Sequence, residues 1–95
     1  MSYSLRLAIE AQYEEVGAYN YYEEIRTGLG DDLLSELEKC YIKIAEHPFY
    51  YSYLENSTIL RHTRVDRFPY IVIYLVSGQH IIILSVRNTS RKPFI

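Results

Sequence analysis

The sequence has few of the residues that build disulfide or metal frameworks. Its 95 residues include one cysteine, three histidines, four glycines and three prolines. One cysteine cannot form an internal disulfide, and no histidine has a partner at a zinc-ligand spacing, so neither a disulfide framework nor a metal site is expected. No repeat, linker or low-complexity tract interrupts the chain. We therefore expect a single domain over residues 1–95 that works in a reducing compartment.

Long hydrophobic runs are also missing. The main apolar run covers only residues 71–76, whereas a membrane span needs about 20 residues. Residues 1–10 contain no apolar signal core. The composition, 48% hydrophobic and 23% charged, is that of a folded globular protein. We expect a cytoplasmic protein with no membrane partner and no cofactor, since so short a domain has little room for a deep pocket.

Acidic residues are scarce in one part of the chain. Residues 57–95 contain one acid, Asp66, and six cations, for a net charge of +5, whereas residues 1–56 carry −7. Five of the six cations are arginines, and the planar guanidinium group suits carboxylate and phosphate recognition. This asymmetry predicts an acidic layer and a basic layer, of which only the basic one suits phosphate or an acidic partner. Ion pairs between these arginines and the acidic helices of the same chain are an equally good interpretation.

The hydrophobic spacing predicts an α+β domain with two helices packed on an antiparallel sheet. The sharpest signal is a helical stripe made by Leu33, Leu34, Leu37, Cys40, Tyr41 and Ile44. In chain order the expected elements are a strand over residues 2–8, a helix over 8–29, a second helix from Asp31 or Asp32 to His47, and strands over 59–66, 69–76 and 80–87. Residues 77–79 are expected to form a hairpin turn.

Three details of this arrangement can be tested directly. Gly28 and Gly30 are expected to break the helices, because glycine accepts the left-handed conformation that helix ends require. Glu15 lies on the apolar face of the first helix, so its carboxylate should reach water or a cation. The strand over 69–76 is apolar on both faces, and two helices cover only one, so the other needs the tail, the curl of the sheet or a partner.

Catalytic chemistry has little support in the residues themselves. Cys40 lies on the core stripe and is expected to be a core cysteine. His62 and Arg64 lie two residues apart, and therefore on one face of a strand. A histidine beside an arginine is the minimum for metal-free RNA cleavage, because one group moves a proton and the other stabilises developing charge. A solvated strand face is the simpler interpretation.

Several short motifs occur in a specific order along nearly the whole chain. They are Tyr21-Tyr22-Glu23, Gly28-Leu29-Gly30, Ile44 with Pro48, Arg67-Phe68-Pro69-Tyr70 with Ile73-Tyr74, and Ser85-Val86 with Ser90-Arg91-Lys92-Pro93. Together they resemble the RelE/ParE superfamily of type II toxin–antitoxin toxins, whose β-α-α-β-β-β layout matches the order predicted from the spacing. The resemblance implies a small bacterial cytoplasmic protein of the kind linked to plasmid stabilisation, which inhibits growth until a cognate antitoxin binds it.

The resemblance leaves the cellular target open, since some members inhibit DNA gyrase and others cleave messenger RNA on the ribosome. Ile71 stands where nuclease-type relatives commonly have a basic residue, and Asn88 where many have a histidine. Asparagine cannot exchange a proton near neutral pH. We therefore expect a toxin that binds gyrase or another essential target without cleaving RNA. The alternatives are a metal-free, ribosome-dependent mRNA endoribonuclease and a degenerate member that binds only its antitoxin.

The candidate site residues lie in the basic part of the chain. In a nuclease, the catalytic candidates are His62, Arg64 and Arg61. Without antitoxin, a homodimer is a further expected state. Target or nucleic-acid binding is expected of Arg61, Arg64, Arg67, Arg87 and Arg91.

Overall fold

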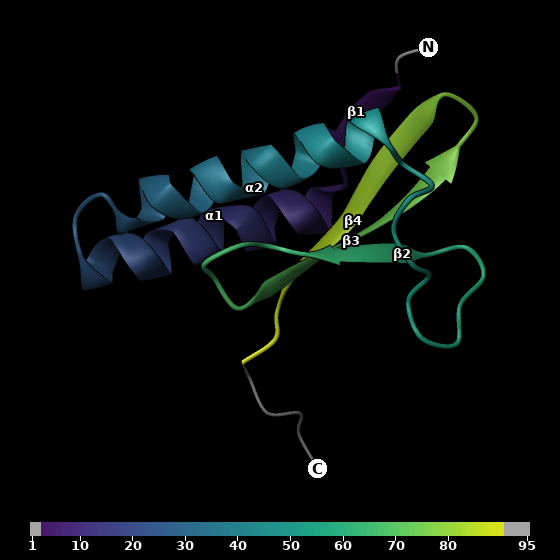
Figure 1. Cartoon of the computed structure of the whole chain (residues 1–95). Coiled ribbons are helices and arrows are strands. Elements are labelled where there is room, and N and C mark those ends of the chain that lie inside the picture. The colour runs from purple at the N-terminus through teal and green to yellow at the C-terminus, as the bar shows by residue number, and fades with distance from the viewer. Residues whose placement is uncertain (1–2, 91–95) are drawn as a thin grey trace.

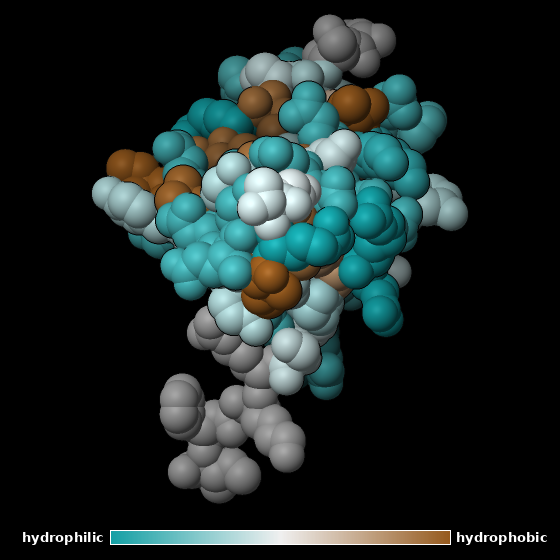
Figure 2. Space-filling view, turned by 90° about the vertical axis from the view of Figure 1, so that its left-hand side faces the viewer, coloured by the Kyte–Doolittle hydropathy of each residue, from teal (hydrophilic) through white to brown (hydrophobic). Residues whose placement is uncertain are grey.

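The computed structural model describes residues 3–90. Its elements are β1 (Ser4–Leu7), α1 (Ile9–Ile25), α2 (Leu29–Glu46), β2 (Arg61–Arg64), β3 (Tyr70–Ser77) and β4 (His80–Asn88). The two helices lie side by side and cover one face of the sheet (Figure 1). This order confirms the α+β prediction. Figure 2 views the end of the molecule formed by the helical hairpin, where hydrophilic residues dominate and hydrophobic ones form small separate groups.

The sheet is mixed, with the strand order β1-β4-β3-β2. Strands β2, β3 and β4 are antiparallel as predicted. Strand β1 is parallel to β4, pairing Ser4 with His80 and Leu7 with Ile83, so the antiparallel prediction was wrong for this strand. Side-chain alternation shows which residues share a face of a strand, but it carries no information on the direction of the neighbouring strand.

Of the helical side chains that are buried in the core, most belong to α2. Leu33, Leu37 and Ile44 are fully buried, Cys40 is 8% exposed, and Leu34 at the margin of the stripe is 36% exposed. The buried members of the stripe pack with β3 and β4 through Val72, Tyr74, Ile81, Ile83 and Val86. The predicted helical stripe is therefore confirmed, and His47 ends the helix as expected.

Helix α1 packs mainly through small residues. Ala11 and Ala18 are its buried side chains, whereas Ile25, which has the helical spacing of the same face, is 59% exposed. The helix ends at Ile25, four residues earlier than predicted, and the end of the hairpin extends past the sheet (Figure 1). Ile25 has the right spacing for this face, but as the last residue of α1 it lies in the part of the hairpin that extends past the described strands.

Two polar side chains join the helices. Glu15 is half-buried, and its carboxylate accepts a 2.7 Å hydrogen bond from the Tyr41 hydroxyl, a partner that the prediction of water or a cation did not include. Burial and this bond raise the pKa of Tyr41. The Glu23 carboxylate accepts the backbone N–H groups of Gly28 and Gly30 at 3.0 and 2.9 Å. A side chain of α1 therefore caps α2, and the prediction that Asp31 or Asp32 caps this helix was wrong.

Only one of the two glycines breaks a helix. Gly28 has φ +93° and precedes α2, whereas Gly30 is buried inside the first turn of α2. A Cβ atom at Gly30 would lie 2.7 Å from the backbone oxygen of Tyr19. Glycine is therefore required at this position because close packing leaves no room for a Cβ atom, and not because the backbone is left-handed.

Replacing Gly30 with alanine is expected to destabilise the protein by about 1 to 3 kcal/mol, because the two helices must move apart. The matched control is Gly17→Ala in α1, where a Cβ meets nothing within 4 Å. That change should stabilise the helix by about 0.5 to 1 kcal/mol. Urea denaturation of the three proteins measures both effects. Equal stability of the Gly30 variant and the native chain would contradict the packing explanation.

Candidate functional site

One face of the sheet is turned away from the helices and is called here the open face. The strand register places Ile71, Ile73 and Leu75 of β3 in its centre, next to Ile82 of β4. Ile73 is 2% exposed but does not belong to the core cluster under the helices. Among the described residues, neither helix covers this face (Figure 1). Its apolar centre agrees with the expectation that one face of the strand over 69–76 is apolar without being covered by a helix.

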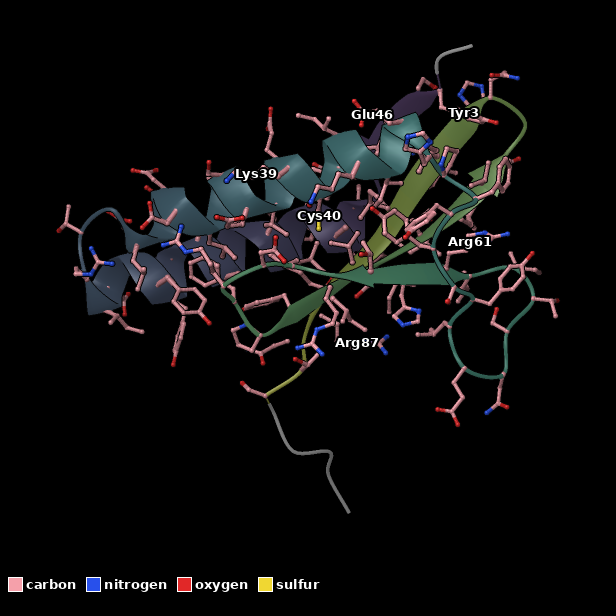
Figure 3. The ribbon with its side chains drawn as sticks, viewed as in Figure 1. Tyr3, Lys39, Cys40, Glu46, Arg61 and Arg87 are labelled. Carbon is pink, nitrogen blue, oxygen red and sulfur yellow. The ribbon has the colours of Figure 1, made fainter. Side chains whose placement is uncertain are left out.

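Basic side chains border the open face. Ile71 pairs with Arg64 on one side and with Arg87 on the other. We call these three residues the arginine row. Paired residues point to the same face, and strands lie about 5 Å apart, so the two arginines leave the backbone about 10 Å from one another. Figure 3 shows Arg87 on the side of the sheet opposite to the helices. His62 is paired with Ile73 in the adjacent row.

Arg61, predicted as a site residue, binds to the loop of its own chain that precedes β2. Its Nη1 donates hydrogen bonds to the backbone oxygens of Tyr51 at 2.6 Å and Phe49 at 3.3 Å. Its guanidinium carbon lies 4.1 Å from the ring centroid of Tyr53 and 5.4 Å from that of Phe49. Arg61 thereby holds the loop between α2 and β2 in place. Its neighbours in sequence do not reveal this, because the loop must first fold back onto β2.

Arg67 is likewise paired within the chain. Its guanidinium lies 3.2 Å from the carboxylate of Glu36, which is 6% exposed, and 3.5 Å from that of Asp32. Its backbone has φ 73°, a left-handed conformation that costs energy for a residue with a Cβ. Ion pairing within the chain therefore accounts for one arginine of the basic segment. Arg91 lies outside the described residues.

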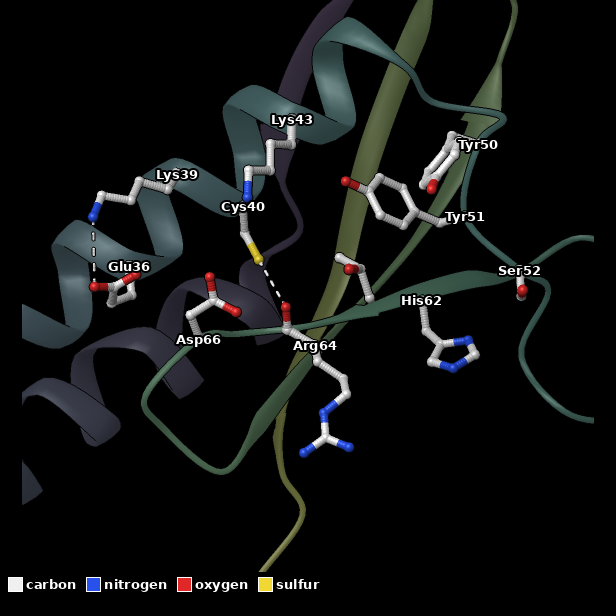
Figure 4. A pocket seen from close by; sticks show the side chains of 11 residues that line it. Glu36, Lys39, Cys40, Lys43, Tyr50, Tyr51, Ser52, His62, Arg64 and Asp66 are labelled. Atoms are coloured by element: carbon white, nitrogen blue, oxygen red, sulfur yellow. Dashed lines mark hydrogen bonds and ion pairs between the residues drawn. The ribbon is translucent and has the colours of Figure 1, made fainter.

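His62 and Arg64 line a groove of about 540 Å³ beside the outer edge of β2. The groove is bounded by α2 and by the loop that carries Tyr50 and Tyr51 (Figure 4). The Nδ1 atom of His62 is buried and has no hydrogen-bond partner among the described residues. In Figure 4 the side chains of His62 and Arg64 point to the opposite side of β2 from Tyr51. The structure therefore brings the predicted pair together, whereas Arg61 faces away from it.

Cys40 also lines this groove, but its thiol is not suited to nucleophilic chemistry. It donates a hydrogen bond to the backbone oxygen of Arg64 at 3.3 Å. Burial, reinforced by the nearby Asp66 carboxylate, raises the pKa of Cys40 to about 11. The reactive thiolate is therefore rare at neutral pH. The prediction of a core cysteine is confirmed by its 8% exposure.

Alkylation can measure this protection. In the native protein at pH 7.5, iodoacetamide should modify Cys40 at least tenfold more slowly than in urea, because both burial and the raised pKa reduce the thiolate available. The native rate should increase as the pH rises toward 11. Mass spectrometry of quenched samples gives both rates. Equal rates in native and unfolded protein would mean that the thiol is accessible.

Glu14 has a role that the sequence did not indicate. Its carboxylate accepts the backbone N–H of Val86 at 2.8 Å and the hydroxyl of Ser85 at 3.0 Å. These residues are 72 and 71 positions away in the chain, so no local pattern connects them. Glu14, Gly17 and Arg87 are among the residues that line a second groove, of about 470 Å³, between α1 and the end of β4.

Neither a metal nor a membrane function gains support from the described residues. No three histidine, cysteine, aspartate or glutamate side chains within residues 3–90 lie close enough together to hold a metal ion. Over the same residues, no helix is both long and apolar enough to cross a membrane. The arrangement instead offers an apolar surface with two arginines and one histidine at its border.

Comparison with known proteins finds similarity in structure but not in sequence. No family model and no curated protein matches the sequence. A solved structure described as the chromosomal ParDE TA system from P. aeruginosa is similar, with a TM-score of 0.80, 15% sequence identity, and coverage of 90% of this chain and 95% of that chain. The present chain has the same fold. The match confirms the RelE/ParE-like fold predicted from the motifs, and at this identity it shows the fold alone.

Proposed function

We propose that this chain is the toxin of a type II toxin–antitoxin system. In this proposal it arrests growth by binding an essential protein through the open face, and a cognate antitoxin neutralises it. DNA gyrase is the first target to test. Support comes from the ParDE-like fold and from the motifs of the sequence. The arginine row is the single observation that carries the choice of mechanism.

The composition of the open face favours a protein target. Its centre is aliphatic, with Ile73 already buried and Ile71, Leu75 and Ile82 half-buried. Protein interfaces combine such an apolar centre with a polar rim, and arginine is enriched in them relative to the rest of the protein surface. A site for RNA would instead need several cations along a phosphate backbone. Ile71 lies between the two arginines and interrupts such a track.

The ribonuclease remains the second candidate because of one observation. The buried, unpartnered Nδ1 of His62 lies in the same groove as Arg64, which is the pairing that metal-free cleavage requires. General acid–base cleavage needs a second proton-transferring group. Cys40 and Tyr51, which also line this groove, do not supply one readily, because burial raises the pKa of each group. We therefore place binding ahead of cleavage.

Induced expression of the chain tests the proposal. Antitoxins of this superfamily are usually encoded beside their toxins. Colony counts should therefore fall on induction and recover when the product of the neighbouring gene is co-expressed. Gyrase supercoiling and messenger RNA cleavage on translating ribosomes are then assayed in parallel with the purified protein. Supercoiling inhibition without cleavage is the expected result. Cleavage would favour the ribonuclease, and binding to the neighbouring product without growth arrest would favour the degenerate member.

A further inference from the structure

The edge of β4 has a neighbouring strand along only part of its length. Strand β1 pairs with His80–Ile83, whereas β3 pairs with β4 as far as Asn88. Beyond Ile83, the β1 side of β4 therefore has no strand neighbour among the described residues. We call the segment 84–88 the free half-edge. An unpaired strand edge presents N–H and C=O groups that can bind another extended chain.

The hydrogen bonds show which groups point outward at this edge. The N–H of Val86 bonds to the Glu14 carboxylate, which lies away from β3, whereas the N–H of Thr89 bonds to Pro69 on the β3 side. Because successive residues of a strand alternate in direction, the N–H and C=O of Asn88 point outward like those of Val86. Glu14 thus occupies the position that a carbonyl of a neighbouring strand would take.

Space is available beside the free half-edge. The groove of about 470 Å³ lies here, between α1 and the end of β4, and it falls within the usual size of binding pockets. Two of its lining residues, Gly17 and Ala18, are among the smallest on α1, and a Cβ placed on Gly17 meets nothing within 4 Å. An extended segment can therefore lie along β4 without a clash at this position.

We propose that the free half-edge is a docking site for an extended segment of the antitoxin, which adds a strand to β4 in line with β1. This inference rests on the proposed function and names the part of the antitoxin that binds. On docking, the Val86 N–H exchanges the Glu14 carboxylate for a backbone carbonyl of the segment. The exposed Glu14 side chain then turns to solvent.

The surroundings define the chemistry of the segment. Side chains of an added strand would point alternately to the two faces of the sheet. Those on the helix side meet Gly17, Ala18 and Tyr21, which suits small or aliphatic residues. Those on the open face lie next to Arg87, which suits a carboxylate. The segment is therefore extended, with aliphatic and acidic residues in alternation, as in other strand-addition complexes where backbone bonds give affinity and side chains give specificity.

Two variants with opposite expected effects test the site. Gly17→Phe fills the groove and should weaken binding of the purified neighbouring gene product at least tenfold, whereas Gly17→Ala, which leaves most of the space, should bind like the native chain. Glu14→Ala removes the competing carboxylate and should strengthen binding two- to fivefold. Affinities are measured by isothermal titration calorimetry, and circular dichroism confirms that each variant is folded. In the complex, amide hydrogen exchange at Asn88 should slow at least tenfold.

The outcomes separate the docking site from the function on which it rests. If the native chain does not bind the neighbouring product, both the docking site and its proposed occupant are overturned. If the native chain binds, equal affinity of Gly17→Phe and Gly17→Ala overturns the docking site and leaves the toxin function standing. Should Gly17→Phe not fold, weaker binding by Glu14→Ala or unchanged exchange at Asn88 overturns the site in the same way.

Discussion

Simultaneous replacement of Arg64 and Arg87 with alanine is expected to abolish growth arrest while leaving the protein folded. Each arginine flanks Ile71 on the open face, and arginine is one of the residue types enriched among the hot spots of protein interfaces. If each truncation costs about 1 to 2 kcal/mol of target binding, the affinity falls about 30- to 700-fold. Colony counts after induction measure the loss, and a Western blot confirms equal expression.

The controls distinguish target binding from catalysis and from net charge. Arg26→Ala removes one exposed arginine from the helical hairpin and should leave growth arrest intact. His62→Ala should also leave it intact, because no proton transfer takes place in a binding mechanism. Growth arrest and ribosomal mRNA cleavage that both disappear with His62→Ala would establish the ribonuclease instead. Supercoiling inhibition that survives this change would support the binding mechanism.

The largest effect on stability is expected from Leu37→Ala. Leu37 is fully buried, with 0% of its surface accessible to solvent, and it lies in the middle of the α2 stripe. Truncation of such a leucine costs about 2 to 5 kcal/mol, because contacts are lost and the cavity relaxes only partly. A domain of this size has only about 5 to 15 kcal/mol of stability in total. The midpoint of urea denaturation should therefore fall steeply, with an unchanged slope.

Leu34→Ala is the matched control on the same helix. Leu34 belongs to the predicted stripe, yet 36% of its surface is exposed. Its truncation should therefore cost about 1 kcal/mol or less. A similar loss of stability for both leucines would contradict the assignment of Leu37 to the buried face of α2 and of Leu34 to its margin. A difference of less than about 1 kcal/mol between the two variants would lead to the same conclusion.

The order and type of the elements follow from local residue patterns. Leu33, Leu37 and Ile44 repeat at the helical period, which predicted both the existence of α2 and its buried face. Gly78, with φ 60°, forms the predicted turn between two apolar strands. The pairing of His62 with Arg64 on one face also follows from spacing, because neighbours two residues apart in a strand share a face. These features depend on residues that are close in sequence.

The candidate site is different, because its parts come from distant segments. The charge composition placed Arg61, Arg64, Arg67 and Arg87, together with Arg91, in one basic group, and tertiary structure divided the four that it describes. Arg61 is used by the loop before β2, and Arg67 pairs with a carboxylate that is buried on α2. Only Arg64 and Arg87 of the four are brought to the two sides of Ile71 by strand pairing. Composition counts charges but does not show which ones the fold neutralises.

Strand pairing also decided the features of the β4 edge. The sequence by itself determined that residues 2–8 contain a strand, that two helices follow it and that three further strands complete the domain. Only the tertiary structure decided that β1 runs parallel to β4, that it ends at Leu7, and that Glu14 bonds to Val86 beyond that end. The physical reason is range: periodicity reports contacts within one turn or one strand, whereas direction, register and edge pairing arise between segments more than 70 residues apart.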